Sequence, residues 1–504
     1  MVAPDTTTVY HIKGTVTGSG GTPLANIYVE ADSSAYQNYA WTAPDGTYSL
    51  VVPAGSYTMW FSDPSGTYLD GYYSSGGFTT TESSATPVTI GSSDATGIDV
   101  QMAPTALALS GFPSPAVAGV SHDITVTALD AYGNIATGYS GTVHFTSSDG
   151  AAVLPANATL AAGVGTFSVT LKTAGTQSVT ATDTLGASIK GTQSGIVVNA
   201  AAATTLAVSG LASPRTAGVA GSITVTAVDA YGNVAVGYLG TVQFTSSDTR
   251  ALLPAAYTFT ALDAGVHTFS ITLKTAGSQG VRATDTVTAT ITGVQNIVVT
   301  PAAAKTLVVS GLTSPRTAGV AGIITVTARD AFGNTATGYR GTIGFTSADT
   351  KATLPANYTF TAANKGVHTF SVTLKTAGNQ SVRARDIATS TITGGQYPIL
   401  VTPAAATTLV VSGLGSPRTA GIAGYITVTA RDAYGNTAIG YRGTVHFTST
   451  DTKALLPANH KFTTANKGVH TFKITLKTRG TQSVRARDTL TSTITGLQSG
   501  IVVR

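Results

Sequence analysis

The 504-residue chain lacks cysteine altogether and has only two glutamates, Glu30 and Glu82. Without cysteine there is no disulfide, no thiol nucleophile and no cysteine-ligated metal site. The scarcity of glutamate excludes a glutamate-based acid–base pair and a His-Glu-x-x-His zinc helix. The sequence also contains no Gly-x-Ser-x-Gly nucleophile elbow, no phosphate-binding loop and no dinucleotide fingerprint. We therefore expect a protein that is not an enzyme and uses no cofactor.

Charged residues and long apolar runs are also scarce. Charged side chains make up 10% of the chain, against a usual share of about 25%. No apolar run reaches the roughly 18 residues of a membrane-spanning helix. Residues 1–8 show neither the basic nor the apolar region of a signal peptide, so export information was either removed or never present. The abundant residues are Thr, Ser, Ala, Val and Gly, which favour short strands and tight turns, so the composition predicts an all-β protein.

One segment recurs four times, at residues 124–134, 223–233, 324–334 and 426–436. It ends in Asp-Ala-Tyr-Gly-Asn, with Phe332 in place of Tyr in the third copy. The aspartates 130, 229, 330 and 432 are 99, 101 and 102 positions apart, and a Thr-Leu-Lys-Thr block recurs around Lys172, Lys274, Lys375 and Lys477. This period fits one small β domain. We therefore predict a first domain at 1–103 and four repeats at 104–203, 204–304, 305–404 and 405–504, with short Ala-rich joints that favour an extended rod.

Within the last repeat, apolar and polar residues alternate along several short segments. Ile426, Val428 and Ala430 alternate with polar residues, as do Val445 and Phe447. The same pattern continues in residues 472–476 and 484–487, and further segments at 409–414 and 494–503 complete the set. Alternation of this kind puts the apolar side chains on one face of a strand. About seven short strands with Gly, Pro and Asp turns predict a two-sheet β-sandwich.

The repeats resemble the bacterial immunoglobulin-like (Ig-like) repeats of surface proteins, including the invasin and intimin group. The resemblance rests on Asp-Ala-Tyr-Gly-Asn, on Gly-Thr-Val-x-Phe-Thr-Ser and on Gly-x-x-Thr-Phe-x-x-Thr-Leu-Lys-Thr-x-Gly, and it spans about 400 residues. It implies tandem Ig-like sandwiches that serve as stalks and spacers.

Residues 1–103 resemble a different family, the carboxypeptidase regulatory-like, prealbumin-type β-sandwich. The resemblance rests on residues 11–17, 22–29, 45–58 and 96–100. It implies a module without catalytic activity. Pilin domains related to this family form a Lys–Asn isopeptide bond beside a buried carboxylate, but residues 51–53 read Val-Val-Pro where we expect the Glu, so no such bond is expected.

Aromatic residues concentrate in the first domain, which holds both tryptophans and nine of the 20 tyrosines. Tyr72 and Tyr73 lie in a Gly/Ser-rich stretch where their rings would be exposed, and we group Trp60 with them. Flat exposed rings stack on sugars or pack against a neighbouring subunit. A partner or carbohydrate contact and ordinary loop packing remain the two interpretations.

The net charge rises steadily along the chain, from −8 in the first domain through −2, 0 and +6 to +9 in the last repeat. This gradient suits head-to-tail self-association or binding of the basic end to anionic cell-envelope components. The residues we select for such a contact are Arg418, Arg442, Arg485, Arg487 and Lys473. Neutral drift among the repeats is the alternative. Nucleic acid is the weakest partner, because the basic repeats have few aromatic residues and no binding motif.

Two recurring groups have simpler interpretations than metal binding or bond formation. Asp130 and Asn134, with their repeats, offer oxygen ligands that could suit calcium, but Asp and Asn more often cap their own turns. Lys172 and its three equivalents follow apolar positions that face inward, so we expect each Lys to be a solvated strand end rather than an isopeptide donor.

These patterns together predict a non-enzymatic structural protein that is extracellular or on the cell surface. It would act as a surface stalk or as the subunit of a head-to-tail filament built of five tandem β-sandwiches. The alternatives are an adhesin or carbohydrate-binding module displayed on an Ig-like stalk, and a virion fibre.

Overall fold

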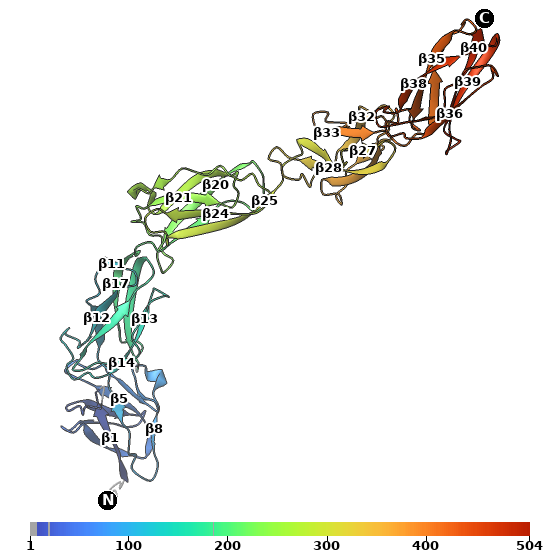
Figure 1. Cartoon of the computed structure of the whole chain (residues 1–504). Helices are drawn as coiled ribbons and strands as arrows, with labels where there is room; N and C mark the ends of the chain where they lie inside the picture. Colours follow the sequence, from blue (N-terminus) through green and yellow to red (C-terminus); the bar gives the residue numbers. More distant parts are fainter. Residues whose placement is uncertain (1–7, 19–20, 185) are drawn as a thin grey trace, which may run out of the picture.

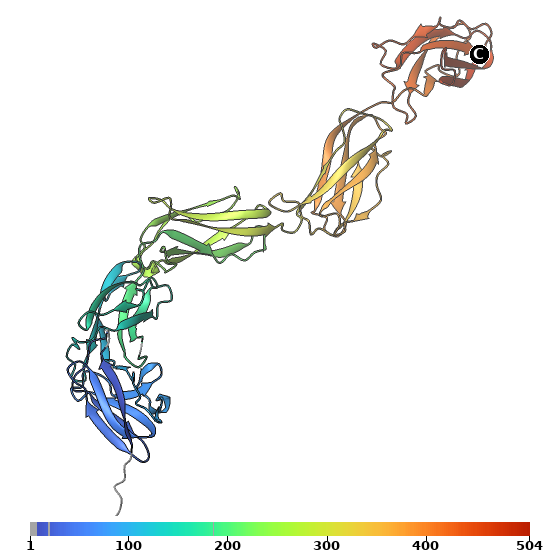
Figure 2. The ribbon, with the colours of Figure 1, turned by 90° about the horizontal axis from the view of Figure 1, so that it is seen from below.

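The computed structural model describes residues 8–18, 21–184 and 186–504, and shows a chain of β-sandwiches joined end to end. Figures 1 and 2 show the domains following one another in a long, curved line, and Figure 1 places the two termini at opposite ends. The helical elements among the described residues are two short 3-10 helices, η1 (Glu82–Ser84) and η2 (Ala261–Asp263). The described residues contain no candidate membrane-spanning helix.

The first domain packs a small sheet against a larger one. The small sheet has the order β4-β1-β9 and the larger one β3-β2-β5-β6-β7, with β8 paired to β5. Between them lie buried side chains such as Ile12, Val29 and Phe61. The strands are β1 (Val9–Thr17), β2 (Tyr28–Asp32), β3 (Gln37–Trp41), β4 (Thr47–Pro53), β5 (Gly55–Ser62), β6 (Gly71–Ser74), β7 (Gly77–Thr79), β8 (Val88–Ile90) and β9 (Val100–Gln101).

The four repeats share one arrangement, in which a three-stranded sheet covers a larger sheet of four or five strands. The first has the sheets β10-β12-β15 and β11-β17-β16-β13-β14, and the later repeats follow the same order. Its strands are β10 (Ala106–Ser110), β11 (Ala116–Val117), β12 (Ser121–Leu129), β13 (Thr142–Ser147), β14 (Ala158–Thr159), β15 (Val164–Thr170), β16 (Gly175–Asp183) and β17 (Lys190–Asn199).

The strands of the second repeat are β18 (Thr205–Ser209), β19 (Arg215–Thr216), β20 (Ala220–Val228), β21 (Thr241–Ser246), β22 (Tyr257–Thr258), β23 (Val266–Thr272), β24 (Gly277–Asp285) and β25 (Thr292–Thr300). Those of the third are β26 (Thr306–Ser310), β27 (Arg316–Thr317), β28 (Ala321–Arg329), β29 (Thr342–Ser347), β30 (Tyr358–Thr359), β31 (Val367–Thr373), β32 (Gly378–Asp386) and β33 (Thr393–Thr402). Those of the fourth are β34 (Thr408–Ser412), β35 (Ala423–Arg431), β36 (Thr444–Ser449), β37 (His460–Lys461), β38 (Val469–Thr475), β39 (Gly480–Asp488) and β40 (Thr495–Val503).

Alternation in the sequence explains which faces form the core. Along β35 the side chains of Ile426, Val428 and Ala430 are fully buried, whereas the residues between them are partly exposed. The inward residues of the two sheets meet in one apolar cluster per repeat. The predicted fold class, all-β with tandem β-sandwiches, is confirmed.

Each repeat also buries one tyrosine–aspartate pair. In the last repeat the Tyr441 hydroxyl donates to the Asp488 carboxylate, and the same bond joins Tyr139 to Asp183 in the first. Burial, followed by this bond, raises the pKa of Tyr441 well above its usual value. Asp488 also accepts hydrogen bonds from the backbone N–H groups of Leu490 and Thr491, both at 2.8–2.9 Å. The pair therefore fixes the turn between β39 and β40 to the core.

Candidate functional sites

An aromatic face covers one side of the larger sheet of the first domain. It is defined here as Tyr28, Tyr39, Trp41, Trp60 and Tyr72. Pairing places Tyr28 opposite Trp41, and Trp60 opposite Tyr72. Because residues two apart on a strand share a face, and paired residues share it too, all five rings project from the same side of the sheet.

Three of these rings pack around Tyr28. The ring centroids of Tyr28 and Tyr39 are 5.3 Å apart and nearly parallel, while Trp41 and Trp60 meet Tyr28 edge-on at 5.3 and 6.1 Å. Tyr39 is 59% exposed and Trp41 is 51% exposed, so the cluster supports two large rings that remain open to solvent. Ordering of exposed rings by their neighbours reduces the entropy lost when a flat ligand stacks on them.

A polar pair borders the aromatic face. Gln37 donates from its side-chain amide to the Glu30 carboxylate, and both residues lie on the strands that hold Tyr39 and Tyr28. Partial burial, then the charge of Glu30, raises the pKa of the Tyr28 phenol. The face therefore combines stacking surfaces with hydrogen-bonding groups, the usual chemistry of a carbohydrate contact.

The three aromatic residues selected from the sequence do not all lie together. Trp60 and Tyr72 belong to the aromatic face, but Tyr73 points to the opposite side and packs against the core. Tyr73 follows Tyr72 directly on β6, so strand alternation separates them. Sequence reasoning missed Tyr28, Tyr39 and Trp41, although the i, i+2 spacing of Tyr39 and Trp41 signals a shared face.

A second recurring site joins each repeat to the next. We define the docking loop as Asp-Ala-Tyr/Phe-Gly-Asn, at residues 229–233, 330–334 and 432–436 in the last three repeats. In the second repeat Asn233 Nδ2 donates to the Lys172 carbonyl of the first repeat at 2.8 Å, and its Oδ1 accepts from the Ala174 N–H at 2.8 Å. Asn334 and Asn436 make the same two bonds to the preceding repeats, at 2.7–2.9 Å.

The docking loop itself is held rigid by its aspartate. Asp229 Oδ1 accepts from the N–H groups of Tyr231 and Asn233 at 2.8 and 2.9 Å. Its Oδ2 accepts from Asn233 Nδ2 and from the N–H of Ala201 in the joint between repeats. These bonds lower the pKa of Asp229 although burial alone would raise it. One carboxylate therefore fastens the loop, its asparagine and the linker together.

The receiving surface of each repeat consists of a glycine turn and the backbone after the recurring lysine. In the first repeat it comprises Gly119 and residues 172–174. The buried Asp149 accepts from the N–H groups of Lys172 and Thr173 at 2.6 and 2.9 Å and so shapes that backbone. Asp248 and Asp349 hold the equivalent turns.

The aromatic ring of each docking loop lies over the glycine of the receiving surface. A Cβ atom at Gly119 would lie 2.0 Å from the Tyr231 hydroxyl, and one at Gly319 would lie 2.0 Å from the Tyr434 hydroxyl. Gly218 has the same relation to Phe332, at 2.2 Å. Only glycine leaves room for the ring at these positions, so the contact depends on residues in two domains.

Basic side chains complete the later joints. Arg250 donates to the Phe332 carbonyl, and Lys351 donates to the Tyr434 carbonyl at 2.5 Å. The Lys172 ammonium lies 5.9 Å from the centre of the Tyr231 ring. We expected Lys172 and its equivalents to be solvated strand ends, but Lys172, Lys274 and Lys375 are half-buried in the joints.

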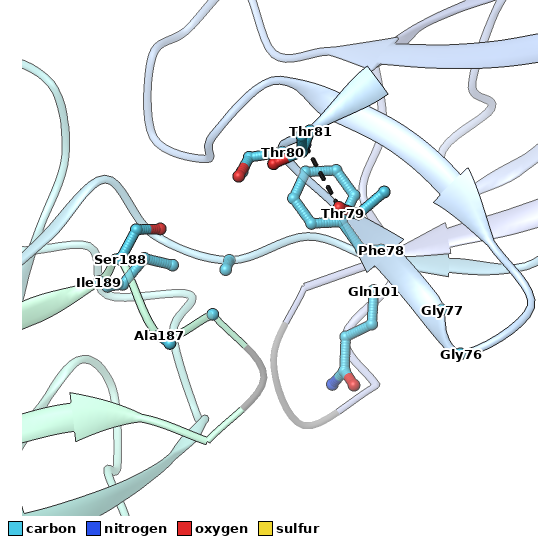
Figure 3. A pocket seen from close by; sticks show the side chains of 12 residues that line it. Gly76, Gly77, Phe78, Thr79, Thr80, Thr81, Gln101, Ala187, Ser188 and Ile189 are labelled. Carbon is cyan, nitrogen blue, oxygen red and sulfur yellow. Dashed lines mark hydrogen bonds between the residues drawn. The ribbon is translucent and has the colours of Figure 1, made fainter. Parts of the chain in front are cut away.

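The first joint uses different contacts. The loop at 130–134 meets the first domain through the Ala131 N–H, which donates to the Gly66 carbonyl at 2.8 Å. Tyr132 is 75% exposed, and the side-chain amide of Asn134 bonds to Asp130 of its own loop. A cavity of about 370 Å³ also lies at this joint, between residues 76–81 and 186–189 (Figure 3). None of the described residues that line it is titratable, so its chemistry is limited to hydrogen bonding and apolar contact.

The basic residues selected for assembly do not form a single patch. Arg485 and Arg487 project from β39, while Lys473 is exposed on β38 of the other sheet. Arg418 is half-buried and donates to the Ile422 carbonyl at 2.7 Å, and Arg442 donates to the carbonyls of Ile439 and Tyr441. Arg418 therefore braces a turn of its own repeat, whereas the side chains of Arg442, Lys473, Arg485 and Arg487 are exposed.

No group of three or more metal-ligating side chains gathers among the residues that the structure describes. Every carboxylate oxygen of Asp229 accepts hydrogen bonds from N–H donors, and a cation would have to displace them. The recurring Asp and Asn therefore act through turn capping and interdomain bonds in this structure.

No protein-family model matches the sequence, and no curated protein matches it. Solved structures similar to it include FdeC, an Escherichia coli adhesin, at 21% identity, 59% coverage of this chain, 96% of that chain and a TM-score of 0.30. Invasin, a bacterial integrin-binding protein, matches at 16% identity, 79% of each chain and a TM-score of 0.30. InvD of Yersinia pseudotuberculosis matches at 17% identity, 58% of this chain, 95% of that chain and a TM-score of 0.26.

Proposed function

We propose that the protein is a non-enzymatic surface stalk that holds its first domain away from the point of attachment. The observation that carries this proposal is the joint made three times by the same asparagine, aromatic ring and glycine. Joints fixed by hydrogen bonds and ring packing favour a stiff rod over freely swinging domains. We retain the domain limits 1–103, 104–203, 204–304, 305–404 and 405–504 and an extracellular or cell-surface location as part of this proposal.

Negative-stain electron microscopy of the full chain tests the stalk. We expect curved rods whose bend at each of the last three joints varies little from particle to particle. Beads at random angles would contradict a stiff stalk. Images at low salt and at about 1 M salt, where the Debye length is about 3 Å, also test head-to-tail filaments. Filaments that form at low salt and dissociate at high salt would show that the charge gradient drives self-assembly. Isolated rods in both conditions would reject self-assembly through the gradient.

A second candidate function is carbohydrate binding by the first domain, which would make the protein an adhesin. Trp41 and Tyr39 are exposed and held by Tyr28, with the Glu30–Gln37 pair beside them. The net charge of −8 in this domain disfavours anionic sugars, so the proposed ligand class is neutral glycans.

A glycan array probed with the full chain tests this second function. We expect Trp41→Ala to abolish binding to neutral glycans and Tyr72→Ala to weaken it. The matched control is Tyr425→Ala, because Tyr425 is 63% exposed on the last repeat, far from the aromatic face. Binding that survives Trp41→Ala, or that falls equally in the control, would remove the aromatic face from the function.

A further inference from the structure

The last repeat carries a complete receiving surface. Gly421 has a φ of +80°, matching +79° at Gly119, +82° at Gly218 and +81° at Gly319. The buried Asp451 accepts from the N–H of Thr478 at 2.9 Å and from the N–H of Lys477, as its equivalents do in the earlier repeats. The backbone at 477–479 is therefore shaped in the same way as the turns that bind Asn233, Asn334 and Asn436 in the last three joints.

This last receiving surface is uncovered within the described chain. No heavy atom lies within 4 Å of a Cβ placed at Gly421, where the other three glycines meet an aromatic ring. Lys477 and Arg479 are exposed, whereas Lys375 and Ala377 at the same positions of the third repeat are half-buried. A backbone shaped for two hydrogen bonds and a ring thus faces solvent.

The rim of the surface is basic. Lys453 is exposed at the position where Arg250 and Lys351 donate to the carbonyl of the docking-loop aromatic residue. Lys477 and Arg479 add two further positive charges. A loop that contains an aspartate and presents a backbone carbonyl is complementary in charge to this rim.

We propose that the surface formed by Gly421, Lys453 and residues 477–479 binds the Asp-Ala-Tyr/Phe-Gly-Asn loop of a further Ig-like domain. The asparagine amide would bond the Lys477 carbonyl and the Arg479 N–H, the ring would cover Gly421, and Lys453 would donate to the carbonyl of the aromatic residue. The docking loops of repeats two to four are occupied in joints of this chain, and the loop at 130–134 lies against Gly66. The partner is therefore a domain whose own docking loop is uncovered.

The test extends the full chain after Arg504 with a second copy of residues 403–504, because the Ala404 N–H of the linker donates to Asp432 of the docking loop in the existing joint. Because the chain has no cysteine, single cysteines can carry spin labels without background. Labels at Tyr425→Cys and at the same position of the added copy report the new joint. Labels at Ile323→Cys and Tyr425→Cys report the existing joint between repeats three and four, and both side chains are exposed.

We expect the new joint to give a distance distribution as narrow as that of the existing joint. Gly421→Ala should broaden it at least twofold, because the added Cβ meets the ring of the incoming loop. A broad distribution that Gly421→Ala leaves unchanged would overturn the proposal. If the added copy does not fold, a copy of residues 301–404, which keeps the linker residue Ala302 that donates to Asp330, takes its place in the same experiment.

Sedimentation of the unextended chain tests the competing occupant. We expect it to remain monomeric. Self-association that Gly421→Ala abolishes would assign the surface to a second copy of this chain and overturn the proposal of a further domain.

Discussion

Asn334 donates from its side-chain Nδ2 to the backbone carbonyl of Lys274 at 2.8 Å, across the boundary between two repeats. The same asparagine accepts from the Ala276 N–H at 2.9 Å. One amide thus satisfies a carbonyl and an N–H of the neighbouring domain, which makes the geometry of the joint specific rather than merely close-packed.

Replacing this asparagine should loosen one joint without unfolding either repeat. Asn334→Ala removes both interdomain bonds, and at about 0.5–1.5 kcal/mol each the coupling between repeats two and three should fall by about 1–3 kcal/mol. Electron microscopy should show a wider range of bend angles at that joint alone. Asn134→Ala is the matched control, because the described hydrogen bonds of Asn134 stay within its own loop. Equal broadening by both variants would contradict a specific role for the asparagine.

A pair of glycine substitutions separates backbone strain from ring packing. Gly319→Ala and Gly421→Ala meet the same positive φ, of +81° and +80°, and each should lose about 1 kcal/mol from that strain. Only Gly319→Ala also displaces a ring, that of Tyr434. In the unextended chain we expect Gly319→Ala to lower the melting temperature more than Gly421→Ala and to widen its joint. Equal effects on stability and on joint angle would mean that the ring contact contributes nothing.

The buried tyrosine–aspartate pair should contribute to the stability of each repeat. Tyr441→Phe removes the hydrogen bond to the buried Asp488 carboxylate and should cost about 1–3 kcal/mol in the free energy of unfolding. Tyr425→Phe, at an exposed position of the same repeat, is the control and should change stability by less than about 0.5 kcal/mol. Urea unfolding monitored by far-ultraviolet circular dichroism measures both, and an unchanged midpoint for Tyr441→Phe would refute this role.

Acid should destabilise the repeats in a defined range. Burial alone would raise the pKa of Asp451, but its hydrogen bonds from Thr478 and Lys477 lower it to about 2. The pKa of this carboxyl is 3.8 in the unfolded chain and lower in the folded repeat. Above pH 3.8 the ionised carboxylate therefore stabilises the folded state, and this stabilisation is lost as the pH falls toward 2. Asp149, Asp248 and Asp349 have pKa values lowered by the same kind of bonds.

Thermal unfolding between pH 5 and pH 2 measures this effect. We expect melting temperatures to stay level above pH 4 and to fall steeply below it. Asp451→Asn should lower stability at pH 5 and flatten the acid response of the last repeat. A melting temperature that rises below pH 4 would contradict the prediction that these ionised carboxylates stabilise the folded repeats.

The fold was predictable because its signals are local. Val428 and Thr429 differ in burial since alternate residues of a strand face opposite sides, and the sequence displays that period directly. The turn-capping role of Asp229 was predictable for the same reason, because two of its partners, Tyr231 and Asn233, lie within four residues.

The joints could not be predicted because their partners lie far apart in the sequence. Asn233 and Lys172 are separated by 61 positions and belong to different repeats. The sequence held one signal of these contacts. A glycine recurs at positions 119, 218 and 319, and each is followed, in the docking loop of the next repeat, by an aromatic residue. The sequence predicted part of the aromatic face, because Trp60 and Tyr72 were selected from it. Tyr28 and Trp41 could not be added, because only the pairing of β2 with β3 and β5 brings them beside Trp60.

The last three repeats each carry a receiving surface at one end and a docking loop at the other, and this arrangement has a genetic consequence. Each unit of about 100 residues encodes both halves of a connection, so a duplicated unit already fits the copies before and after it. Recombination between copies would lengthen or shorten the rod by whole units and leave every interface intact. The reach of the first domain is therefore a property that unequal crossing-over can change in a single event, without any new amino-acid substitution.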